Sequence, residues 1–131
     1  MVRMEKVKNY WLRRGSLAER LGFPSQYQLR LPLLELIAER GGAVRPSARV
    51  DGRDLYEALG RRVGLSPKAM LEPRPGAKGS AWKNHVAWTR YTLAKEGLLV
   101  SDPPGTWKLT ALGRKSVRSG TISRPKVPKS Q

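Results

Sequence analysis

The longest helical pattern in this chain runs from Ala81 to Glu96, and two short apolar runs follow it directly. Ser80 precedes the pattern as an N-cap, and Gly97 follows it as a residue that can adopt a left-handed conformation. The apolar runs at 98–100 and 106–109 are separated by the residues SDPPG, which is typical of a β-hairpin. A helix that leads straight into a hairpin must share its core, so this junction limits the fold more than any other segment.

Shorter helical patterns come before it. We expect helices over 3–14 and 16–21, a third start at Ser25, and a new helix that begins at Pro32, because proline favours the first helical position. This helix, Pro32 to Arg40, is expected to be central to the core. Residues 43–50 suit an extended link, 51–63 a helix, 66–71 one further turn, and 72–80 a loop.

The order of helices followed by a hairpin predicts an α+β fold, mainly α, of the winged-helix type. Such a fold has a three-helix helix-turn-helix core and a C-terminal β-hairpin as its wing. We assign residues 1–23 to an extra N-terminal helical arm, 24–117 to the winged-helix domain, and 118–131, in which four cations lie among Ser, Pro and Gly, to a disordered basic tail.

The positive charge is unevenly distributed along the chain. Of 131 residues, 26 are Lys or Arg and 10 are Asp or Glu, for a net charge of +16. Residues 1–30 carry +5, residues 31–64 only +1, and residues 65–131 carry +10. Two basic flanks around a nearly neutral middle indicate a face for a polyanion, and nucleic acid is the polyanion that we expect.

Several function classes lack their sequence signals. There is no cysteine and one histidine, and the ten acids are scattered, so we expect no metal site, no catalytic residues and no cofactor. No apolar run approaches the roughly 20 residues of a membrane span, and no signal peptide is visible at the start. We therefore expect no membrane partner and a cytoplasmic protein, either associated with the nucleoid or encoded by a phage.

Three separated motifs resemble a known family. They are PSQY with LPLLEL at 24–36, VAWTRYTLAKEGLL at 86–99, and GTWKLTALG at 105–113. In this order they resemble the N-terminal domain of Mrr-type restriction endonucleases. The resemblance implies a winged-helix DNA-recognition module, which in that family usually precedes a nuclease domain that cuts modified DNA. This chain contains no Asp followed by a Glu-x-Lys triplet, so the resemblance implies binding and not cutting.

Candidate contacts to double-stranded DNA follow from position. Ser80, Lys83 and Asn84 open the expected recognition helix, where base edges are met, and Asn84 suits adenine while Lys83 suits guanine. Expected phosphate contacts are the cations of the loop, helix, hairpin and arm: Arg74, Lys78, Arg90, Lys108, Arg13 and Arg14. Arg90 could equally lie along the core stripe of its helix.

The aromatic residues and the histidine divide between core and surface. Trp88 and Trp107 are predicted to lie in the core. Trp82, in the first turn beside the basic loop, is a candidate for exposure and for base stacking. His85 suits either a phosphate contact or a hydrogen bond in the core.

Three functions remain open from the sequence. The first is duplex DNA binding, by a reader related to restriction systems or by a transcription regulator, with possible sensitivity to base modification. The second is binding of RNA or single strands through Trp82 and the basic tail. The third is a protein–protein adaptor, and in any of these a homodimer could form through Trp11 and Leu12 of the arm.

Overall fold

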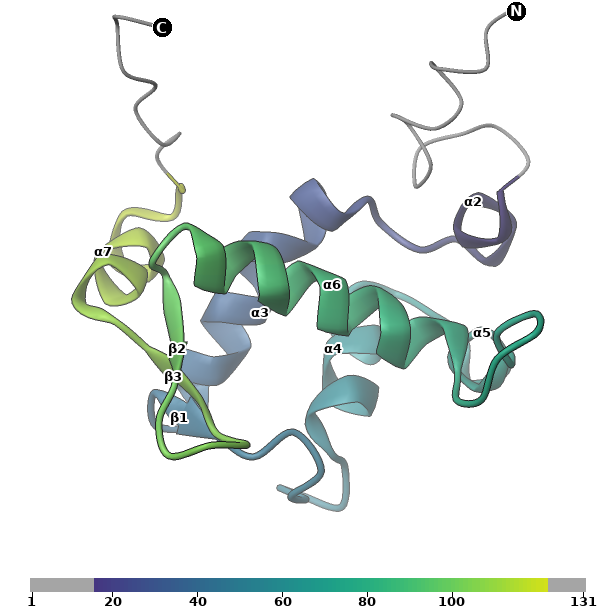
Figure 1. The fold of residues 1–131 in the computed structure, drawn as a ribbon, viewed down its shortest axis with the longest axis horizontal. Coiled ribbons are helices and arrows are strands. Elements are labelled where there is room, and N and C mark those ends of the chain that lie inside the picture. The colour runs from purple at the N-terminus through teal and green to yellow at the C-terminus, as the bar shows by residue number, and fades with distance from the viewer. Residues whose placement is uncertain (1–15, 123–131) are drawn as a thin grey trace, which may run out of the picture.

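A computed structural model describes residues 16–122 of the chain (Figure 1). Residues 1–15 and 123–131 lie outside the described residues. Four predictions fall there and are not tested: the helix over 3–14, the contacts of Arg13 and Arg14, the dimer contact of Trp11 and Leu12, and the disorder of residues 123–131. The expected start of the tail at residue 118 is wrong, because residues 118 and 119 complete the last helix.

The described chain has an α+β fold in which helices pack beside a small antiparallel sheet that lies toward one end of the molecule (Figure 1). The elements follow one another as α2 (Leu17–Leu21), α3 (Gln26–Glu39), β1 (Ala43–Val44), α4 (Leu55–Arg62), α5 (Pro67–Leu71), α6 (Ala81–Lys95), β2 (Leu99–Ser101), β3 (Trp107–Leu109) and α7 (Ala111–Ser119). Among the described helices, none is both long and apolar enough to cross a bilayer.

Helix α3 corrects the expectation that a new helix begins at Pro32. One continuous helix starts after the N-cap Ser25, whose side chain and that of Gln28 form a capping box, and Pro32 lies inside it. Proline removes one hydrogen bond, here to the carbonyl of the exposed Gln28, which water can reach. Apolar residues buried on both sides of Pro32, including Leu29 and Leu33, keep the helix together.

The sheet has three strands, not the two of the predicted hairpin. Strand β3 lies in the middle and pairs antiparallel with β2 and with β1. The segment expected to be only an extended link therefore supplies the third strand. Val44 faces Trp107 on the buried side of the sheet, while Ala43 faces Lys108 on the outer side.

The core lies between α3, α4, α6 and the inner face of the sheet. Helix α6 crosses in front of α3 and α4 in the view of Figure 1. The predicted central residues of α3 are buried, as are the α6 residues that face them: Leu33, Leu34, Leu36, Ile37, Val86, Thr89 and Leu93. This packing leaves the opposite side of α6 toward solvent.

Candidate nucleic-acid interface

The first turn of α6 and the loop before it bring five predicted contact residues together. The Ser80 hydroxyl caps α6 by accepting a hydrogen bond from the backbone N–H of Lys83 at 3.0 Å. The loop closes on itself, because Ala81 N–H donates to the carbonyl of Glu72 at 2.8 Å and Arg74 N–H to that of Gly79 at 3.1 Å. Closure places the cations of the loop at the N-terminal end of α6, beside the capped first turn. The five residues are Arg74, Lys78, Ser80, Lys83 and Asn84.

Two cations on one flank of α6 lie over aromatic rings. The Lys83 ammonium is 5.3 Å from the centre of the Tyr56 ring, and the Arg90 guanidinium is 5.8 Å from that of Trp107. Tyr56 and Trp107 meet edge to face at 6.0 Å. The four residues form a row, Lys83–Tyr56–Trp107–Arg90, that joins α4, α6 and β3. Cation–π contacts of this kind restrain long side chains whose charged ends remain accessible.

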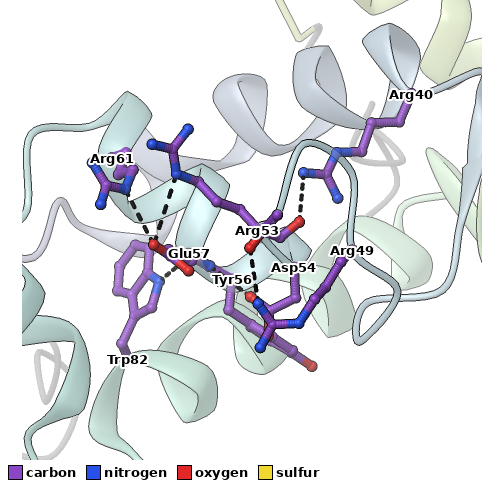
Figure 2. Close-up of polar contacts among 9 residues, drawn as sticks. Arg40, Arg49, Arg53, Asp54, Tyr56, Glu57, Arg61 and Trp82 are labelled. Atoms are coloured by element: carbon purple, nitrogen blue, oxygen red, sulfur yellow. Dashed lines mark hydrogen bonds and ion pairs between the residues drawn. The ribbon is translucent and has the colours of Figure 1, made fainter.

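Figure 2 shows the polar contacts around Tyr56, the member of this row that belongs to α4. The Tyr56 backbone carbonyl accepts a hydrogen bond from the indole N–H of Trp82 at 2.7 Å. Asp54 caps α4 through the N–H of Glu57 at 2.9 Å. Burial raises the pKa of the Tyr56 hydroxyl above its ordinary value; the Asp54 carboxylate adds to the rise and Arg90 opposes it. Tyr56 is therefore neutral at physiological pH.

The arginines around α4 are already occupied within the protein. Glu57 lies between Arg53 and Arg61, and the Arg40 guanidinium donates to the carbonyl of Arg53 at 3.1 Å (Figure 2). Arg62 pairs with Glu35 and Glu39 of α3. In the nearly neutral middle of the sequence, four carboxylate–arginine pairs therefore already engage Arg53, Arg61 and Arg62.

The cations near α6 differ from those of α4. Within residues 16–122, no carboxylate forms an ion pair with Arg74, Lys78, Lys83, Arg90 or Lys95. The Nε atom of Arg90 is buried and has no hydrogen-bond partner among these residues. Helix α6 and its loop therefore carry positive charge that is available to an anionic partner, whereas the arginines of α4 are paired.

Two tryptophans of α6 exchange their expected places. Trp82 is buried, with 1% of its surface exposed, so the expectation that it stacks on bases is wrong. It lies on the same helical face as Val86 and Leu93 and packs edge to face on Phe23 at 5.0 Å. Trp88, expected in the core, is 46% exposed because it projects from the opposite face. Trp107 is buried as predicted.

The outward face of α6 is therefore aromatic. Trp88 and Tyr91, both 46% exposed, meet edge to face at 5.7 Å. The Lys95 ammonium lies 5.7 Å from the centre of the Tyr91 ring. Asn84 and Ala87 complete a shallow depression with these two rings. The sequence reasoning missed this face; the one-turn spacing of Asn84, Trp88 and Tyr91 was the signal that could have revealed it.

Three further predicted residues occupy different places. Arg90 reaches along the flank of α6 to Trp107 and its Nε atom is buried, in agreement with the alternative that it lies along the core stripe of its helix; the alternative of a phosphate contact stays a prediction. Lys108 lies on the outer face of the sheet, opposite to the face that carries Trp107, so the structure does not bring it to the first turn of α6. His85 is buried, and its Nε2 forms a hydrogen bond with the carbonyl of Pro24 at 2.7 Å, in agreement with the core alternative.

Comparison with known proteins identifies one family. Residues 27–119 match the family model described as the Mrr N-terminal domain. This span contains every element from α3 to α7. No curated protein and no solved structure matches the chain.

Proposed function

This chain belongs to the Mrr N-terminal domain family, and from that premise we propose that it is a winged-helix module that binds double-stranded DNA. The order α3, β1, α4, α6, β2, β3 and the central position of β3 in the sheet support this architecture. In it, α6 is the recognition helix that enters the major groove and the turn between β2 and β3 is the wing.

One observation carries the proposal: three cations that form no ion pair in the described chain, Arg74, Lys78 and Lys83, lie together at the N-terminal end of α6. Arg74 and Lys78 of the loop bind phosphates on one side of the groove, which releases counterions. Lys83 and Asn84 reach base edges from the capped first turn, and Ser80 fixes that turn by its cap. Tyr56 and Trp107 orient Lys83 and Arg90 toward the duplex.

Neutralising these cations tests the proposal. In the triple variant Arg74→Gln, Lys78→Gln, Lys83→Gln, affinity for a short duplex of mixed sequence should fall by about two orders of magnitude near 0.1 M salt. Arg53→Gln, Arg61→Gln, Arg62→Gln is the matched control, because it removes the same charge from cations that are already paired with carboxylates, and it should bind nearly as the unaltered protein does. Fluorescence anisotropy measures both. Equal binding by the triple variant and the unaltered protein would refute the assignment of this surface.

The aromatic face of α6 suggests what the module reads. Apolar side chains in the major groove contact the 5-methyl group of pyrimidines, and Trp88 and Tyr91 offer such a contact without a charge. This makes sensitivity to base modification part of the proposal. Duplexes that differ only in their pyrimidine 5-methyl groups should bind with different affinity, and Trp88→Ala should abolish the difference while leaving binding to the unmethylated duplex nearly unchanged.

We propose binding without catalysis. In residues 16–122 no three His, Asp or Glu side chains come together as a metal site would require. Incubation with plasmid DNA and Mg²⁺ checks this directly: the plasmid should stay intact, whether or not its bases are methylated.

Trp88 and Tyr91 also support a second candidate, the binding of single-stranded nucleic acid. Exposed rings with a nearby Lys95 are the parts from which base-stacking platforms are built. Competition between duplex and single strands of the same sequence distinguishes the two candidates. A preference for the single strand that is lost in Trp88→Ala would favour this second function over the first.

A further inference from the structure

Helix α7 presents a basic face that the proposed interface does not use. On one side of the helix, Gly113 and Ser116 are buried against the core. On the other side, Arg114, Lys115 and Arg118 are exposed. At about 100° per residue these three side chains fall within an arc of about 100° on the outward side. They form a compact patch, which we call the α7 basic face.

Within residues 16–122, no carboxylate forms an ion pair with the α7 basic face, that is, with Arg114, Lys115 or Arg118. Asp102 is the last acidic residue of the sequence. Arg114 and Arg118 are four residues apart on one helix, where like charges repel each other and destabilise the helix. A polyanion that lies across the helix would reduce this repulsion and so stabilise it.

The α7 basic face is held firmly on the core. The Thr110 hydroxyl donates to the carbonyl of Gly97 at 2.6 Å and caps α7 through the N–H of Gly113 at 3.0 Å, so α7 begins against the end of α6. A Cβ atom on Gly113 would lie 2.2 Å from the carbonyl oxygen of Leu98, which shows how closely the helix approaches. The Arg114 guanidinium lies over Gly42, at 3.0 Å from the position of a Cβ there.

The two basic regions lie at opposite ends of α6. The loop with Arg74 and Lys78 adjoins its N-terminal end, and α7 adjoins its C-terminal end (Figure 1). A helix of 15 residues is about 22 Å long, which exceeds the major-groove width of about 12 Å. We propose that the α7 basic face binds the phosphate backbone of a second DNA segment, while α6 and its loop hold the first. This inference rests on the proposed function, because it takes DNA as the first ligand.

A bridging experiment tests the second surface. One duplex is immobilised, the full chain is added, unbound protein is washed away, and a second, fluorescent duplex is supplied. The unaltered chain should retain the fluorescent duplex, and mass photometry should find one protein chain on two duplexes. In Arg114→Gln, Lys115→Gln, Arg118→Gln, binding of the first duplex should persist, while retention of the second falls at least about tenfold, since three phosphate contacts are lost.

Two further variants act as controls. Arg53→Gln, Arg61→Gln, Arg62→Gln removes the same charge from cations that are already paired, and it should bridge as the unaltered chain does. Arg114→Lys, Arg118→Lys keeps the positive charge and should bridge two duplexes as the unaltered chain does. Melting curves of all variants exclude loss of the fold as the cause.

The outcomes separate this inference from the proposed function. If the unaltered chain binds one duplex and never retains a second, the α7 inference is overturned and the proposed function stands. If it binds no duplex, both fail. Bridging that persists in the α7 triple variant, or that requires two protein chains, overturns the inference as well, because the second contact then lies elsewhere.

Discussion

At the scale of single residues, His85 joins α6 to the segment that leads into α3. Its ring is fully buried, lies 5.3 Å from the Phe23 ring centre and bonds the Pro24 carbonyl through Nε2. Burial lowers the pKa of His85 below its ordinary value, and the hydrogen bond with Pro24 only partly opposes this effect. The folded protein therefore holds a neutral imidazole at physiological pH.

This lowered pKa predicts how stability depends on pH. Below the ordinary histidine pKa of about 6.5, the unfolded chain takes up a proton that the folded chain refuses, so acid favours unfolding. The contribution of His85 is complete above that pH and declines as pH falls toward the folded pKa. Urea unfolding at pH 7.5 and 5.5 should show this loss. In His85→Gln, whose amide can still donate to the Pro24 carbonyl, the loss should be smaller; an equal loss in both proteins would assign it to other groups.

The tryptophans show what residue type can and cannot predict. Trp82 and Trp88 are chemically identical, yet one is buried and the other half exposed, because they are six residues apart and so point about 120° away from each other around the axis of α6. Reading the wheel from the confirmed core residues Val86 and Leu93 would have put Trp82 inside. The indole N–H of Trp82, in contrast, finds its acceptor on α4, and no local pattern predicts such a partner.

At the scale of elements, the helices of the core were predictable and the sheet was predictable only in part. Capping residues and apolar spacing identify α4, α6 and the strands β2 and β3, since these signals are local. Strand β1 consists of Ala43 and Val44 alone, too short for any alternation, and it becomes a strand only by pairing with β3. The prediction that a helix begins at Pro32 was wrong because it also used a local signal alone. Burial along the whole of α3 outweighs the preference of proline for the first position of a helix.

The attachment of α7 gives a prediction at this scale. Gly113→Ala adds a Cβ atom at 2.2 Å from the Leu98 carbonyl oxygen, on backbone that cannot move aside without shifting the turn after α6. Helix propensity alone would make alanine stabilising, so the sign of the effect is informative. We expect a loss of about 1–3 kcal/mol in the free energy of unfolding, measured by urea titration.

A substitution on the exposed side of the same helix provides the comparison. Leu112 is 46% exposed, so Leu112→Ala should change the free energy of unfolding by less than about 0.5 kcal/mol. If Gly113→Ala were neutral or stabilising, the close approach of α7 to the end of α6 would not be essential to the fold.

At the scale of the whole molecule, the arrangement of charge matters more than its total. Arginines of α4 are paired with carboxylates of α3 and α4, whereas cations of α7 and of the loop before α6 form no ion pair within the described residues and contribute to the net charge of +16. The sequence predicts the uneven distribution, since acids and bases can be counted along it. Which cations are paired depends on contacts such as Arg62 with Glu39, which join distant segments and follow only from the fold.

This division predicts the salt dependence of duplex binding. Each phosphate that a cation neutralises releases a counterion, so the logarithm of the association constant falls with the logarithm of salt concentration by about 0.9 per contact. Replacing Arg74, Lys78 and Lys83 by glutamine should make that slope shallower by about 1.8, because Arg74 and Lys78 are the two of them that we assign to phosphates. The control Arg53→Gln, Arg61→Gln, Arg62→Gln removes the same charge and should leave the slope nearly unchanged, since these arginines are already paired with carboxylates. Anisotropy titrations across a salt series give both slopes. Equal reductions in the two triple variants would mean that net charge alone drives binding, whichever cations supply it.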